Sequence, residues 1–157
     1  VQQMNKSEAV FADRQRAASF YDRALSDISG IRPIHLPQNV SSTYYKYICY
    51  LEEHIDRLAV KRHLREHYDV SLTGEVYADL CHTEPVWQSY TYCGAHRDDQ
   101  THCGRWPACG CVQMQSGFPG AERLSRHHIC LPLYAGLTDV ELEYTVDSLG
   151  KTLRELS

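Results

Sequence analysis

Apolar side chains recur every three or four residues in four segments of the chain, which is the spacing of a helix with one buried face. The segments cover residues 7–29, 55–68, 118–128 and 138–156. In the second helix, Leu58, Ala59 and Leu64 are expected in the core. Gly30 is expected to end the first helix. Thr138 and Glu141 predict a capping box at the start of the last helix, because each side chain can bond to the backbone amide of the other residue.

Other segments favour strands. Residues 43–51 are rich in tyrosine and isoleucine, residues 129–133 form a short apolar run, and residues 70–77 indicate a weaker strand broken at Gly74. Residues 31–42 contain two prolines and are expected to be an extended connector. The resulting order of helices and strands predicts an α/β fold, as a small α+β domain in which helices cover a small sheet.

Length and charge narrow the possible functions. The chain has 157 residues, enough for one domain with a modest core. Its formal net charge is −4, without a basic stripe or a local basic run, so a nucleic-acid partner is not expected. The apolar runs are too short to span a bilayer, and the first residues do not have the pattern of a signal peptide. We therefore expect a cytoplasmic protein that does not bind a membrane.

A cysteine-rich segment covers residues 91–117, whose glycines and polar residues lack periodicity and predict a long loop. Four of the seven cysteines lie in it: Cys93, Cys103, Cys109 and Cys111. Together with nearby histidines they could supply a tetrahedral zinc site. Their spacing, C-x9-C-x5-C-x-C, lacks the paired C-x2-C that is typical of zinc sites. Unligated thiols in a loop are the alternative interpretation.

Three segments of the chain resemble one known family. They are RQRAASFYDRAL at residues 14–25, GEVYADLCHTEPVW at residues 74–87, and FPGAERL at residues 118–124 continuing to ICLPLYAGLTD at residues 129–139. In this order they resemble the closing part of the DegT/DnrJ/EryC1/StrS family of pyridoxal-phosphate sugar aminotransferases. The resemblance implies that residues 1–157 are a single C-terminal small domain of a larger fold-type-I enzyme, with a cysteine-rich insert at residues 91–117.

The resemblance also implies a reaction. It is transamination of a nucleotide-linked keto-sugar, or a keto-cyclitol, by an amino donor in a homodimer that uses pyridoxal phosphate. The catalytic lysine and most cofactor-binding groups belong to the family's large N-terminal domain. The small domain alone is therefore expected to have no catalytic residues and to contribute part of the substrate pocket.

The resemblance places three substrate-binding candidates in the second segment, at Tyr77, His82 and Glu84. A phenol and an imidazole can bond to sugar hydroxyls or diphosphate oxygens. The chain has Val76 where the family often has histidine, and Glu84 where it usually has glutamine, so the identity of the substrate stays open. The structural alternatives are a packed tyrosine at a strand end, a helix-capping histidine and a solvated acid in a first helical turn.

Two further points concern the role of Lys46 and the alternative functions of the chain. Lys46 follows Ser42 at a spacing seen around some cofactor lysines, but an exposed strand lysine is the favoured interpretation. The alternative functions are a standalone zinc-stapled binding module and a structural protein derived from the same fold.

Overall fold

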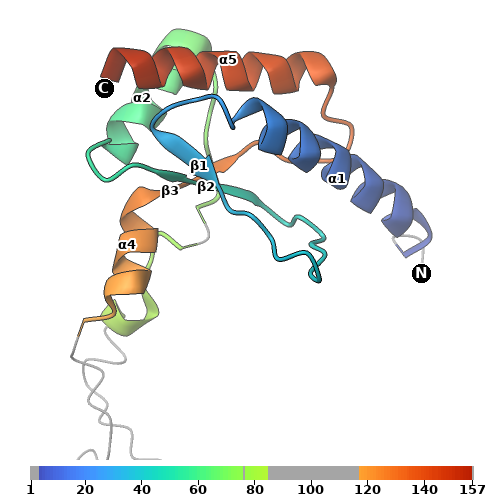
Figure 1. The fold of residues 1–157 in the computed structure, drawn as a ribbon, viewed down its shortest axis with the longest axis horizontal. Coiled ribbons are helices and arrows are strands. Elements are labelled where there is room, and N and C mark those ends of the chain that lie inside the picture. Colours follow the sequence, from blue (N-terminus) through green and yellow to red (C-terminus); the bar gives the residue numbers. More distant parts are fainter. Residues whose placement is uncertain (1–3, 76, 85–116, 157) are drawn as a thin grey trace, which may run out of the picture. The chain divides into compact units, whose positions relative to one another are not determined.

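The computed structural model describes residues 4–75, 77–84 and 117–156. The chain divides into two compact units, residues 1–75 with 127–157 and residues 76–126. Figure 1 shows the elements in chain order: η1 (Met4–Lys6), α1 (Ser7–Ala24), β1 (Ile31–Pro33), β2 (Tyr47–Leu51), α2 (Arg57–Tyr68), η2 (Cys81–Thr83), α4 (Pro119–His127), β3 (His128–Leu131) and α5 (Asp139–Leu156). The second unit contains η2 and α4 as far as Arg126. No helix in the described part of the chain is long and apolar enough to cross a membrane.

The first unit is built on a three-stranded antiparallel sheet with the order β1-β2-β3. The central strand β2 alternates, because Tyr47, Cys49 and Leu51 are buried while Ile48 and Tyr50 are partly exposed. Helices α1, α2 and α5 cover the face to which the buried side chains point (Figure 1). The predicted small sheet covered by helices is therefore confirmed.

The core of the first unit forms where α1, α5 and the sheet meet. Ala17, Ala18 and Tyr21 on α1 are fully buried. The Tyr21 hydroxyl donates a hydrogen bond of 2.9 Å to the Pro132 carbonyl, which follows β3. The Tyr47 hydroxyl donates one of 2.6 Å to the Asp22 carboxylate. Each phenol thus has an apolar ring in the core and a satisfied hydroxyl at its edge.

Helix α2 has clear signals at both ends. The Asp56 side chain accepts the Leu58 amide at 2.8 Å, and Asp69 ends the helix in a left-handed conformation at φ 54°. Leu64 is buried, as predicted, whereas Leu58 is 63% exposed. The prediction for Leu58 was wrong because the buried face of α2 runs through Val60 and Leu64, and Leu58 lies outside that stripe.

The structure corrects several element boundaries. Helix α1 ends at Ala24, and the chain then turns to Gly30, which has φ +86°. Residues 31–33, expected to be a connector, form the edge strand β1, where Pro33 is tolerated. Strand β2 begins only at Tyr47, since Tyr44 has φ +46° and cannot belong to a strand. Residues 70–75 do not form the weak strand that was predicted.

Candidate functional site

A short turn in the second unit carries the predicted substrate-binding residues. Thr83 fixes this turn twice, because its amide and its hydroxyl donate to the Leu80 carbonyl at 2.9 and 2.8 Å. The Glu84 amide donates to the Cys81 carbonyl at 3.2 Å. The single helical turn η2 that results sets the direction of His82, its central residue. Residues 85–116, which follow this turn, lie outside the described residues.

His82 packs between two side chains from the start of α4. Its ring centroid is 4.8 Å from that of Phe118, and its Nε2 lies 3.4 Å from a carboxylate oxygen of Glu122. The His82 side chain is only 15% exposed. The same Glu122 oxygen accepts the Phe118 amide at 3.1 Å, so one carboxylate orients the imidazole and satisfies an amide at the start of α4. We call His82, Phe118 and Glu122 the His82 cluster.

A second link joins the same two segments farther along α4. The Ser125 hydroxyl donates a hydrogen bond of 2.9 Å to the Ala78 carbonyl, and Ser125 is buried. Two segments about 40 residues apart in sequence are therefore held together at both ends. Both belong to the motifs on which the family resemblance rests.

The other two candidates stay near the surface. Tyr77 is 41% exposed and Glu84 is exposed. The Glu84 carboxylate forms no ion pair or hydrogen bond with another residue in the described part of the chain. The structure thus gives His82 fixed partners and leaves the Tyr77 and Glu84 side chains accessible. A substrate-binding role for the three residues stays a prediction.

Sequence reasoning singled out His82 but missed its partners. Phe118 and Glu122 lie within the FPGAERL run, so they were part of a recognised motif but had no assigned role. The signal that could have pointed to Glu122 is its position in the first turn of a helix, where a carboxylate is favoured. Its pairing with His82 depends on tertiary contact and has no local signature.

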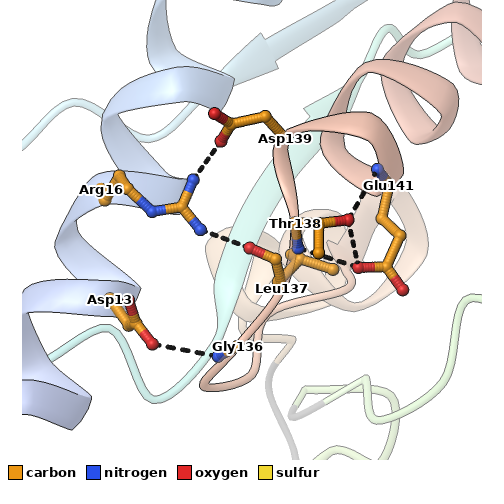
Figure 2. Close-up of polar contacts among 7 residues, drawn as sticks. All are labelled: Asp13, Arg16, Gly136, Leu137, Thr138, Asp139 and Glu141. Atoms are coloured by element: carbon orange, nitrogen blue, oxygen red, sulfur yellow. Dashed lines mark hydrogen bonds and ion pairs between the residues drawn. The ribbon is translucent and has the colours of Figure 1, made fainter.

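The remaining motif residues form a separate cluster in the first unit (Figure 2). Asp13 of α1 accepts the Gly136 amide at 3.0 Å, and the Arg16 guanidinium bonds to the Asp139 carboxylate and the Leu137 carbonyl. We call these residues the helix-junction cluster. They fasten α1 to the residues that enter α5, so this part of the motif stabilises the fold.

The predicted capping box at the start of α5 is confirmed (Figure 2). Glu141 accepts the Thr138 amide at 2.8 Å and its hydroxyl at 2.7 Å, and the Glu141 amide donates to that hydroxyl at 3.3 Å. The side-chain and backbone hydrogen bonds from Thr138 lower the pKa of the Glu141 carboxyl below its usual range.

Lys46 lines a hollow of about 130 Å³ together with Ser42 and Tyr44. It precedes β2 by one residue, and its Nζ lies 2.5 Å from the place that a Cβ on Gly74 would take. It also lies over the Tyr45 ring, 5.4 Å from the centroid. Lys46 is partly buried and lies in a bend before β2, so the prediction of an exposed strand lysine was wrong in both respects.

The four predicted zinc ligands, Cys93, Cys103, Cys109 and Cys111, lie outside the described residues. In the described part of the chain, no group of three or more histidine, cysteine or acidic side chains could hold a metal ion. The zinc site therefore stays a prediction.

Comparison with known proteins identifies a matching family and solved structures with a similar fold. The model of the DegT/DnrJ/EryC1/StrS aminotransferase family matches residues 1–150. The aminotransferase TlmJ from Streptoalloteichus hindustanus superposes with a TM-score of 0.67 at 24% identity, over 98% of this chain and 34% of that one. A DegT DnrJ EryC1 StrS aminotransferase from Brucella abortus gives 0.69 at 18% identity, over 94% and 32%.

A third solved structure is described as a sugar aminotransferase. It is CalS13 from Micromonospora echinospora, with a TM-score of 0.66 at 14% identity, over 92% of this chain and 31% of that one. The chain thus spans about a third of the length of the solved structures that it matches. No protein of curated function matches the sequence.

Proposed function

Because the chain belongs to the DegT/DnrJ/EryC1/StrS aminotransferase family, we propose that it is the C-terminal small domain of a sugar aminotransferase that uses pyridoxal phosphate. Its substrate is a nucleotide-linked keto-sugar, or a related keto-cyclitol, which receives nitrogen from an amino donor. On the family resemblance alone we also propose that the enzyme is a homodimer. The domain contributes residues to the substrate pocket and does not catalyse transamination by itself.

The His82 cluster is the observation that carries this proposal. One nitrogen of the His82 ring faces the Glu122 carboxylate at 3.4 Å, and Phe118 packs on the ring. The Nδ1 atom makes no hydrogen bond with another residue in the described ranges. An imidazole fixed in this way can present one nitrogen to a sugar hydroxyl or a phosphate oxygen with little loss of conformational freedom.

Tyr77 and Glu84 complete the proposed contribution to the pocket. A phenol both donates and accepts hydrogen bonds, whereas an ionised carboxylate only accepts them. Glu84 would therefore bind a donor group of the substrate, such as a sugar hydroxyl, and would repel a phosphate. This chemistry favours a position for Glu84 beside the sugar rather than beside the diphosphate.

The lysines of this chain do not fit the role of the residue that binds pyridoxal phosphate. Lys6 is exposed beside α1, and Lys46 packs on Gly74. Lys61 is paired with Glu75, and Lys151 with Asp147 at 2.6 Å. These are all the lysines in the sequence. The cofactor lysine of the proposed enzyme therefore belongs to its large domain.

The first test examines the gene. The DNA upstream of the Val1 codon should encode, in frame, a large domain with a lysine suited to the cofactor. The protein made from the whole reading frame should aminate members of a panel of thymidine- and uridine-diphosphate-linked keto-sugars with L-glutamate, as followed by mass spectrometry. A start codon directly before Val1, or transamination by residues 1–157 alone, would contradict the proposal.

The second test addresses the site in that enzyme. His82→Asn should raise KM for the keto-sugar by about tenfold, as expected for one lost hydrogen bond to a charged or polar group, with a smaller change in kcat. Glu122→Gln should have a weaker effect of the same kind. His54→Asn is the matched control, because the His54 ring also lies near a carboxylate, at 3.6 Å from Glu52. His54 belongs to the first unit and its side chain is 61% exposed, so its replacement should leave KM unchanged. An unchanged KM in His82→Asn would remove His82 from the pocket.

A further inference from the structure

A hollow of about 610 Å³ lies in the first unit beside α2 and the segment that follows it, both drawn in green in Figure 1. Its polar lining comes from two stretches of chain: Lys61, Arg62, Arg65 and Glu66 on α2, and Ser71 and Thr73 after it. These residues belong to neither the His82 cluster nor the helix-junction cluster. A ligand of this hollow is therefore independent of the proposed function.

The charge of the lining is positive. Three cationic side chains face one carboxylate, in a chain whose formal net charge is −4. The sequence showed no basic stripe and no extended basic run, since Lys61 and Arg62 are followed by His63 and Leu64 before Arg65. The helix brings them together, since positions three and four apart lie on the same face. The hollow is thus a feature that only the folded chain reveals.

One of the three cations already has a partner. Lys61 forms an ion pair with Glu75. Burial alone would raise the pKa of Glu75, but the hydrogen bond and charge of Lys61 keep that pKa below its usual range. This pair is only 26% and 14% exposed, so Lys61 acts as a fixed part of the wall.

The two arginines are uncompensated. Neither Arg62 nor Arg65 forms an ion pair or hydrogen bond with another residue in the ranges that the structure describes. Glu66 lies four positions after Arg62, which is a spacing that allows pairing on a helix, yet the two do not pair. Two guanidinium groups at the edge of one hollow can bind oxyanions through pairs of parallel N–H donors.

The segment that follows α2 supplies neutral donors to the lining. Val70 and Leu72 are 8% and 4% exposed and anchor the segment to the core, and the Val70 amide donates to the Leu64 carbonyl at 3.1 Å. Ser71 and Thr73 come directly after these two residues and line the hollow together with Leu72. Their hydroxyls make no hydrogen bond with other residues in the described part of the chain. The wall is therefore held in place while its donors stay available.

We propose that this hollow binds a phosphate group, either free or as the ester of a small molecule. Arg62 and Arg65 bind its oxygens from the α2 side, and the hydroxyls of Ser71 and Thr73 donate from the other side. Lys61 contributes positive charge, which Glu75 partly offsets. The hollow has room for more than one phosphate, so a small phosphorylated ligand fits its size as well as its charge.

Calorimetric titration of the whole chain tests the proposal, with inorganic phosphate and glycerol phosphate as the two probes. We expect saturable binding that weakens as salt is added, because the arginines are exposed. The double variant Arg62→Gln/Arg65→Gln should bind at least about tenfold more weakly, since it loses charge-assisted hydrogen bonds. Arg23→Gln is the matched control, an exposed arginine on α1 that lies away from the hollow. It should bind as the unaltered chain does.

A second variant keeps the test decisive should the double variant fold poorly. Glu66→Gln removes the one acid among the described lining residues and should tighten phosphate binding about threefold, an effect typical of one exposed charge at short range. The comparison of the two probes identifies the source of the phosphate group, with tighter binding of the ester indicating a phosphorylated small molecule. Absence of saturable binding, or equal affinity in all variants, would overturn the proposal.

Discussion

The guanidinium of Arg16 on α1 forms an ion pair with the carboxylate of Asp139, which lies 123 residues later at the first position of α5. A second nitrogen of Arg16 donates to the Leu137 carbonyl, as Figure 2 shows. One arginine therefore joins the first long helix of the chain to the last one. Its partners lie in the run Gly-Leu-Thr-Asp at residues 136–139. This part of the motif therefore contributes to the stability of the fold.

Replacement of Arg16 by glutamine should lower the free energy of unfolding by about 1–2 kcal/mol. The exposed ion pair contributes little of this, and the hydrogen bond to the buried Leu137 carbonyl contributes more. Urea denaturation followed by circular dichroism measures the change. Arg23→Gln, on the same helix, should have almost no effect. Equal stability of the two variants would show that the helix-junction cluster does not hold α1 in place.

The capping box predicts a stability that depends on pH. Thr138→Ala should cost about 1 kcal/mol through loss of the cap, and Thr138→Ser should cost less. Because the Glu141 pKa is lowered in the folded protein, its contribution is present above the pKa of an unfolded glutamate and is lost as the pH falls through the folded value. Unfolding measured at pH 7 and pH 3 should show that Glu141→Gln destabilises the protein only at the higher pH. A penalty of the same size at both values would contradict this assignment.

Alkaline pH should destabilise the protein from about pH 9 upward, where cysteine thiols and tyrosine phenols of an unfolded chain begin to ionise. Burial raises the pKa of Tyr21, Tyr47 and Cys49 in the folded state. Such groups add stability below their unfolded pKa values, and that stability is lost as the pH rises. Denaturation midpoints recorded between neutral and strongly alkaline pH measure the effect.

The variant Tyr47→Phe separates this effect from general alkaline damage. It should cost about 1–2 kcal/mol at neutral pH, because the bond to the Asp22 carboxylate is lost. The difference from the unaltered protein should shrink at high pH, since one titrating group has been removed. Tyr45→Phe is the control, because Tyr45 is 71% exposed and should leave the pH profile unchanged.

Two glycines with nearly equal backbone angles form a matched pair. Gly30 has φ +86° and Gly136 has φ +85°. A Cβ on Gly30 would lie 2.7 Å from Cδ1 of the buried Ile55, whereas a Cβ on Gly136 would meet nothing within 4 Å. Each alanine variant should lose about 1 kcal/mol through backbone strain, and Gly30→Ala should lose more because Ile55 must move. Urea denaturation of both variants tests the order, which a larger loss for Gly136→Ala would contradict.

The cysteine-rich segment predicts about one zinc ion per chain, which elemental analysis of the purified protein can measure. Chelation should then lower the temperature of unfolding. Cys109→Ser should lose the metal, whereas Cys81→Ser should keep it, because Cys81 is an exposed free thiol of η2 outside the predicted ligand set. A metal-free protein that stays folded would remove the zinc site and the alternative of a zinc-stapled module.

The sequence by itself predicted the four helices, a small sheet covered by helices and the capping box of Thr138 and Glu141. These features depend on periodicity and on bonds between residues three or four apart, which the order of residues alone specifies. The family motifs also selected the segment that contains Tyr77, His82 and Glu84. The exposure of Tyr77 and Glu84, and the fixed orientation of His82, could not be read from that order.

Tertiary structure decided the remaining features, because each depends on residues far apart in the chain. Strand β1 exists only because residues 31–33 lie beside β2, and their local sequence favours an extended connector. The pairing of His82 with Glu122 and of Arg16 with Asp139 follows from how segments pack. The basic hollow likewise requires α2 and residues 71–73 to line the same space. Local pattern therefore determined the elements, and packing decided which charged and polar side chains meet.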